Sequence, residues 1–131
     1  MKLPLRPLLI LLVLVFTAPA FSADAPAKPA PKHFLIVLRL APRLHDDKAW
    51  TDADNAAVGA HFQRLKAATA AGQVVLAGRT PEAGDKTMGL VVFTAPDATA
   101  ARAFMDGDPC VAAGVMLAEL RPFDLALLRA K

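Results

Sequence analysis

The chain has 131 residues, which is enough for one small domain and too few for two. Its 15 basic and 12 acidic residues give a formal charge of +3, so it lacks the strong basic excess that nucleic-acid binding proteins use. Tyrosine is absent and there is a single tryptophan, so no surface for stacking nucleic-acid bases is predicted either.

The first 22 residues have the layout of a secretory signal peptide. Lys2 and Arg6 precede an apolar run over residues 8–16, and small residues follow that run. The run is far shorter than the roughly 20 residues that a membrane-spanning helix needs, so we expect no stable membrane insertion after cleavage. Cleavage is predicted after Ser22, with Ala20 as the alternative, and the mature protein is expected to be periplasmic or secreted.

Loss of this leader removes two basic residues and no acidic one, which leaves 13 basic residues against 12 acidic ones. Residues 23–32, ADAPAKPAPK, alternate alanine with proline and predict an extended spacer without a core. The folded domain is therefore assigned to residues 33–131. Cys110 is the only cysteine, so no internal disulfide is possible. It is either a small buried apolar residue, which is the commoner case, or a reactive thiol.

Apolar runs bounded by proline, glycine or charged residues predict four strands, over residues 34–41, 73–78, 87–95 and 115–128. Pro122 removes a backbone donor from the last run, which suits an edge strand. A short turn is predicted through DPCVAAG, residues 108–114, just before that strand. Asp108 suits the start of the turn, because the proline after it disfavours helix and aspartate can accept from its own backbone.

Two helices separate these strands. The first is capped by Thr51 or Asp52 and ends before Gly72. Its predicted inward stripe is formed by Val58, Phe62, Leu65 and Thr69. His61 lies on the shoulder of that stripe and not on the solvent side. The second helix follows Asp97 and ends at Gly107, and its predicted inner face is formed by Ala101, Phe104 and Met105.

The order strand, helix, strand, strand, helix, strand predicts a ferredoxin-like α+β fold. Such a fold has a four-stranded antiparallel sheet with both helices on one face, and its first and third strands are central. Those two runs are apolar on both faces here, so a second apolar face would be left open. We expect a homodimer to cover it, and the alternative is that the spacer or the C-terminal tail does so.

Several motifs in this frame resemble the YciI-like, or YCII-related, domain family. His61 is followed eleven residues later by Gly72, Ala77 and Gly78 end the second strand, and Asp-Pro-x-x-x-x-Gly spans residues 108–114. The resemblance covers residues 34–127. Family members mostly have an aromatic residue where this chain has Cys110, have proline where it has Arg79, and are mostly cytoplasmic.

The resemblance implies a ferredoxin-like fold that dimerises as an α+β barrel. It also implies a candidate site centred on a histidine and an aspartate, carried here by His61 and Asp108. One branch of the family eliminates chloride from a hydroxylated aromatic ring, while most members have no assigned reaction. A carboxylate on one imidazole nitrogen can orient the ring and stabilise its protonated form, as in a general base. The alternative is that the pair only pins the first helix to the turn.

Arg79 ends the second predicted strand, and Arg39 interrupts the first. Both arginines are expected to bind an anionic group of a substrate. Cys110 is also expected to contact the substrate. Solvated strand ends or ion pairs are the plainer alternative for both arginines. The run His45, Asp46, Asp47 lacks the spacing of a metal site, and no nucleotide or cofactor loop is present. The sequence therefore predicts neither a metal nor a cofactor.

Three functions remain open from the sequence. The protein is a small-molecule lyase, isomerase or hydrolase with His61 as base, a protein that binds a small ligand without turnover, or a dimer with a structural role. A catalytic His61 has to border a pocket, whereas a purely structural pair is sealed in the core.

Overall fold

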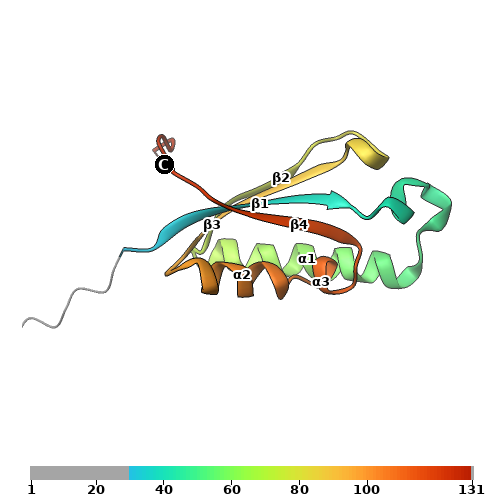
Figure 1. The fold of residues 1–131 in the computed structure, drawn as a ribbon, viewed down its shortest axis with the longest axis horizontal. Coiled ribbons are helices and arrows are strands. Elements are labelled where there is room, and N and C mark those ends of the chain that lie inside the picture. Colours follow the sequence, from blue (N-terminus) through green and yellow to red (C-terminus); the bar gives the residue numbers. More distant parts are fainter. Residues whose placement is uncertain (1–29, 131) are drawn as a thin grey trace, which may run out of the picture.

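The computed structural model describes residues 30–130, so the predicted signal peptide and most of the spacer lie outside the described residues. The helices and strands follow the predicted order with one extra short helix (Figure 1), and they are β1 (Lys32–Leu40), α1 (Asp52–Ala70), β2 (Val74–Arg79), β3 (Met88–Ala95), α2 (Ala98–Asp106), α3 (Pro109–Ala112) and β4 (Met116–Pro122). Within residues 30–130, no helix has the length and apolar character needed to cross a membrane.

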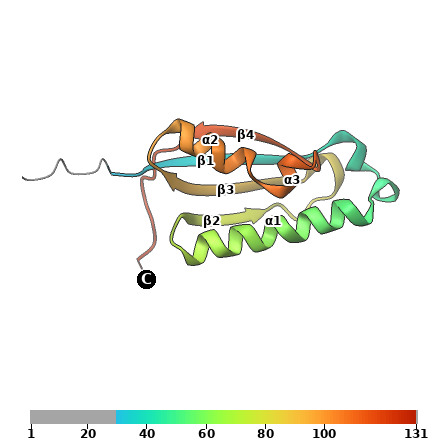
Figure 2. The same ribbon diagram turned by 90° about the horizontal axis from the view of Figure 1, so that it is seen from below.

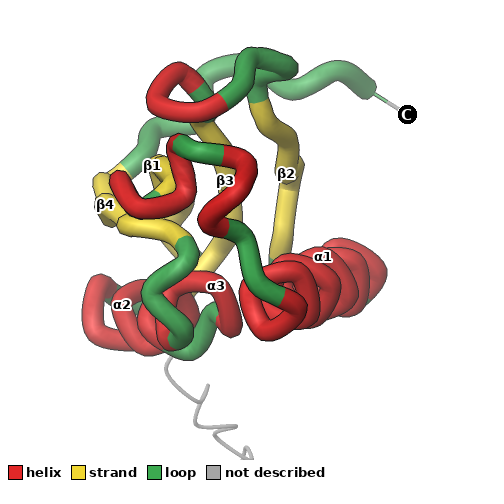
Figure 3. Tube along the Cα trace, turned by 90° about the vertical axis from the view of Figure 1, so that its right-hand side faces the viewer, coloured by secondary structure: helices red, strands yellow, loops and turns green. Residues whose placement is uncertain are grey.

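The four strands form one antiparallel sheet in the order β2-β3-β1-β4. The helices α1, α2 and α3 all lie on one face of it (Figures 1 and 3). Helix α1 runs along β2, while α2 and α3 lie on the side of β1 and β4 (Figure 2). This is the predicted ferredoxin-like α+β fold, with β1 and β3 central and β4 at an edge.

The main core lies between the sheet and the helices. Phe34, Ile36 and Leu38 alternate along β1 toward the helices and are buried, as the period of two in a strand requires. Phe93 of β3 has no exposed surface, and its ring stacks on Phe104 of α2 with centroids 4.6 Å apart. Helix α2 therefore packs on the sheet through its predicted inner face.

Helix α1 begins where the sequence predicts but presents a different face to the core. Thr51 caps it through a capping box with Asp54, a residue that also accepts two hydrogen bonds from Arg43. The predicted inward position of Phe62 is wrong, because that side chain is 61% exposed. The half-buried His61 lies on the inward side in its place, together with the buried Leu65. The helix is turned so that the side chains of Asp54 and His61 face inward, where Asp54 binds Arg43 and His61 binds Asp108.

Two further boundaries differ from prediction near the C-terminus. The segment predicted as a turn contains one helical turn, α3, because Asp108 caps it and Pro109 occupies its first position. Strand β4 ends at Pro122 and does not continue to residue 128. The β1–β4 ladder ends where Phe34 pairs with Pro122. Beyond it, the Phe123 N–H donates one more backbone hydrogen bond to the His33 carbonyl, at 3.1 Å.

The face of the sheet opposite the helices is apolar along its centre, while Arg39, Glu119 and Arg121 add charged groups toward the β4 edge. Leu35 and Val37 of β1 pair there with Val92 and Leu90 of β3. The edge strands add the exposed Leu76 and Leu117, which pair with inner-strand residues of the same face. The C-terminal segment after β4 lies on this side (Figures 1 and 3), and it leaves both edge leucines exposed.

Candidate active site

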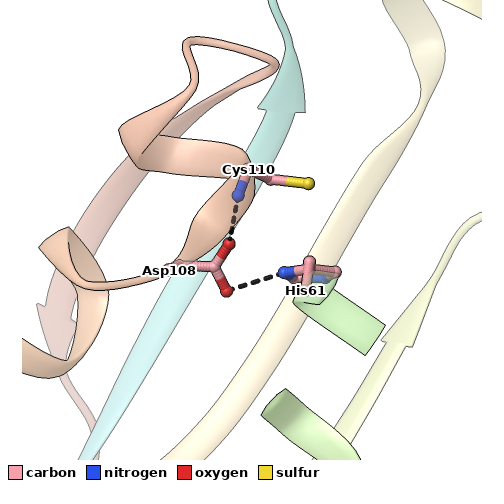
Figure 4. Close-up of side chains that lie close together, drawn as sticks. All are labelled: His61, Asp108 and Cys110. Atoms are coloured by element: carbon pink, nitrogen blue, oxygen red, sulfur yellow. Dashed lines mark hydrogen bonds and ion pairs between the residues drawn. The ribbon is translucent and has the colours of Figure 1, made fainter. Parts of the chain in front are cut away.

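His61 and Asp108 meet where α1 passes the start of α3. His61 lies on the inward side of α1, and Asp108 is the residue that caps α3. The His61 Nδ1 and the Asp108 Oδ2 are 2.7 Å apart, and the second oxygen, Oδ1, accepts from the Cys110 N–H at 2.9 Å (Figure 4). Asp108 therefore caps a helix, as the Asp-Pro step predicts, and at the same time binds the imidazole that the family resemblance implies as its partner.

The carboxylate of Asp108 is ionised in this setting. Burial by itself raises its pKa, but the hydrogen bond and charge of His61, the Cys110 N–H and the charge of Arg64 together outweigh burial, and the pKa of Asp108 falls below its usual value. An ionised carboxylate only accepts hydrogen bonds, so the His61 Nδ1 has to carry the proton between them. The Nε2 of His61 is then the atom that can take or give a proton elsewhere.

Arg64 is a third charged member of the site. Its Nη1 lies 3.8 Å from the Asp108 Oδ2 and is buried without a hydrogen-bond partner. Its Nη2 donates to the Phe104 carbonyl at 2.7 Å, near the end of α2, and the guanidinium lies 4.3 Å from the centre of the Phe104 ring. Arg64 thus joins α1 to α2 and places a fixed positive charge beside the carboxylate.

Cys110 lies beside the pair but is fully buried. Burial, with the nearby charge of Asp108, raises the pKa of its thiol to about 11. Donor atoms of His61, Asp108 and Cys110 lie within 4.8 Å of one another, which raises the question of a metal. A metal-bound cysteine is a thiolate, and both carboxylate oxygens already accept hydrogen bonds. The prediction of no metal therefore remains a prediction.

A cavity of about 710 Å³ lies between α1 and the sheet, and His61 lines it. Neither Asp108 nor Cys110 does. The walls are mainly apolar, and they include Leu38, Val58, Phe62, Leu65, Val91 and Met116. The side chain of His61 is 14% exposed and that of Asp108 only 7%. The imidazole therefore links a buried carboxylate on one side to an apolar cavity on the other.

The two arginines expected to bind substrate both border the cavity, but from opposite faces of the sheet. Arg79 and Arg39 both line it. The register places Arg79 opposite Gly89, on the face of the sheet that carries the helices. Arg39 alternates to the opposite face, where its Nη2 approaches the Met88 sulfur at 3.7 Å. Cys110, the third expected substrate contact, lies behind the pair and away from the cavity lining.

Comparison with known proteins identifies the family of this domain. The model of the YCII-related domain family matches residues 37–124. The chain belongs to the YCII-related domain family. No curated protein matches it. The matched range of this YCII-related domain holds the His61–Asp108 pair and every residue that lines the cavity.

Sequence reasoning missed two basic residues of this YCII-related domain. No role was predicted from the sequence for Arg64 or Lys66, but Arg64 contacts Asp108 and Lys66 lines the cavity. The signal for Arg64 was available, because residues three apart share a helix face and Arg64 is three residues after His61. Lys66 carried no comparable signal, since it lines the cavity only because α1 is turned as described above.

Proposed function

We propose that this YCII-related protein is a small-molecule enzyme in which His61 acts as general acid and base and Asp108 orients it. The observation that carries the proposal is the position of His61 between the ionised Asp108 and a mainly apolar cavity. The carboxylate fixes the ring and its tautomer and stabilises the imidazolium that forms when Nε2 takes a proton.

The chemistry that fits is proton transfer without a cofactor. The Nε2 of His61 removes a proton from a carbon acid, a hydroxyl group or a water molecule in the cavity. It then returns that proton to a leaving group or to another carbon of the same molecule. These steps cover elimination, isomerisation and hydrolysis, so the reaction is that of a lyase, an isomerase or a hydrolase, and no metal or cofactor is expected.

The alternative is a protein that binds a small ligand or has a structural role as a dimer, with no turnover. The low exposure of the two side chains favours it, because a pair that only pins α1 to α3 would look similar. Both proposals assume the same cellular location and the same oligomeric state. We propose an exported, periplasmic or secreted homodimer, supported by the signal-like leader and by the apolar open face of the sheet.

The proposal is tested with three activated compounds, one for each reaction class. They are a nitrophenyl ester for hydrolysis, a ketone for proton exchange with deuterated water, and a halogenated hydroxyaromatic compound for elimination. We expect the parent protein to act on at least one of them. The His61→Asn variant should lose about 10²–10⁴-fold in that rate, the range typical of a lost general acid or base.

The asparagine variant is chosen because its amide N–H can still donate to Asp108 while the proton-accepting Nε2 is gone. His45→Gln is the control, because His45 is exposed in a loop and does not line the cavity. Turnover that survives in His61→Asn would overturn the catalytic role of His61. No turnover of any of the three compounds by the parent would favour the alternative of ligand binding.

A further inference from the structure

We propose that the occupant of the cavity is a small organic anion with a flat apolar body, and that Lys66 and Arg79 hold its anionic oxygen group. This inference rests on the proposed function, since it names the class of molecule that His61 would act on. It also stands as a statement about binding, so it can be tested without a known reaction.

The charges around the cavity are of one sign. Arg39, Lys66 and Arg79 line it, and no aspartate or glutamate does. The carboxylate of Asp108 is bound by His61 and the Cys110 N–H and does not line the cavity. The chain as a whole has nearly as many acidic residues as basic ones. The excess of positive charge is therefore a property of this cavity and not of the composition.

These cations also have no carboxylate partner in the described part of the chain. Within residues 30–130, the arginine–carboxylate pairs closer than 4.0 Å involve Arg43, Arg64 and Arg121, none of which lines the cavity. The unpaired cations border mainly apolar walls, where an opposite charge is screened less than in open water. Lys66 and Arg79 are exposed, and Arg79 also donates to the Thr80 carbonyl at 3.3 Å, so both can turn toward an anion in the cavity without breaking an ion pair.

The size and shape of the cavity limit the body of this anion. Its volume of about 710 Å³ lies within the range of roughly 300–1,000 Å³ found for small-molecule sites. Gly89 forms part of the floor, and a side chain there would crowd Leu38, since an added Cβ would lie 3.2 Å from the Leu38 Cβ. No side chain projects into the cavity from the sheet at Gly89. This suits a flat apolar molecule that lies on the sheet.

The polar groups of the cavity come from both of its walls. Lys66 follows His61 by five residues on α1, so it lies about 7.5 Å farther along the helix axis and about 140° around it. Arg79 approaches from the end of β2 on the helix side of the sheet. All three residues line this one cavity, so an anion held by the two cations lies in the same space as the imidazole of His61. Arg39 adds positive charge but lies on the other face.

Binding of three matched probes to the mature protein tests this proposal. The probes are benzoate, benzyl alcohol and benzylamine, and binding is followed by chemical-shift changes of the cavity methyl groups. We expect benzoate to bind about tenfold more tightly than the neutral alcohol, the equivalent of one charge-assisted hydrogen bond. The cationic amine should bind more weakly than either.

Lys66→Gln and Arg79→Gln should each weaken benzoate binding severalfold and leave benzyl alcohol unchanged. Both residues are exposed, so the fold should tolerate these changes. Lys48→Gln and Arg102→Gln are the matched controls, because both residues are exposed and neither lines the cavity. Equal affinity for benzoate and the alcohol, no effect of either cavity variant, or no benzoate binding at millimolar concentration would overturn the proposal.

The His61→Asn variant separates this inference from the proposed function. It should bind benzoate as the parent does, because Lys66 and Arg79 are unchanged, and it should still lack turnover. Selective benzoate binding without turnover by the parent would support the anion site and reject the enzyme. Turnover with no preference for anions would do the reverse.

Discussion

The Nη1 atom of Arg64 lies 3.8 Å from the Oδ2 of Asp108, the same oxygen that binds His61. This Nη1 is buried and has no hydrogen-bond partner. A positive charge in this position competes with the imidazolium form of His61 for the negative charge of Asp108. Arg64 and His61 therefore share one buried carboxylate.

Replacement of Arg64 should be visible in the titration of His61. In Arg64→Met, the midpoint of the His61 ring-proton titration is expected to move to higher pH, because Asp108 then acts on the imidazolium alone. The other charged or titratable groups near His61 are the Cys110 thiol and the cavity cations Lys66 and Arg79, which the variant leaves in place. Arg102→Met, on the exposed side of α2, is the control.

The same variant should also lose stability, by about 1–2 kcal/mol, because Arg64 gives up its bond to the Phe104 carbonyl and its contact with that ring. Urea unfolding followed by circular dichroism measures this loss. A loss of stability with an unmoved His61 titration would show that Arg64 only ties α1 to α2.

Acid should destabilise the domain through Asp54. The hydrogen bonds from Arg43 and then Thr51 hold the pKa of Asp54 well below its usual range, so folding is favoured when this group is ionised. That contribution is present above the unfolded value of about 3.9 and is lost as pH falls toward the lower folded value. Urea unfolding between about pH 6 and about pH 3 should therefore show a smaller fall in stability for Asp54→Asn than for the parent. Parallel curves for the two proteins would mean that other groups govern acid unfolding.

The open face of the sheet should join two copies of the chain. Leu76 and Leu117 are 48% and 58% exposed on that face, one on each edge strand. Light scattering at micromolar concentration should give the mass of a dimer for the mature parent and of a monomer for Leu76→Lys combined with Leu117→Lys. Thr99→Lys, on the exposed surface of α2, should remain dimeric. A parent that is monomeric at this concentration would refute the homodimer.

Export should leave a new N-terminus. Sequencing of the protein from the cell envelope or the medium is expected to start at Ala23, because the small residues Ala20 and Ser22 precede that position. A start at Phe21 would keep export and move only the cleavage site. An intact Met1 on protein recovered from the cytoplasm would contradict the assignment of a signal peptide.

The fold was predictable because its signals are local or periodic. The apolar runs of β1 and β3 are long enough to mark central strands, and Thr51 and Gly72 mark the ends of the first helix. The rotation of α1 was not predictable in this way. A hydrophobic pattern places Phe62 inside, but hydrogen bonds to Arg43 and Asp108, which are distant in sequence, place Asp54 and His61 there instead.

The site was predictable in part for a related reason. The Asp-Pro step marks Asp108 as a cap, and the family resemblance connects it to His61 across 47 residues. No local pattern shows that Lys66 borders a cavity or that Cys110 is sealed behind the pair. Both facts depend on how α1 and α3 pack against the sheet. That packing is not specified by any single segment of the sequence.

The central claim is that Asp108 acts on His61 through its charge, and NMR titration of the His61 ring protons in the parent and in Asp108→Asn tests it most directly. Asparagine can still cap α3, so the fold should be kept. We predict that the midpoint of the His61 titration moves to lower pH in Asp108→Asn, because the charge that stabilises the imidazolium is gone. An unchanged midpoint in a folded variant would contradict the claim and leave Asp108 as a helix cap alone.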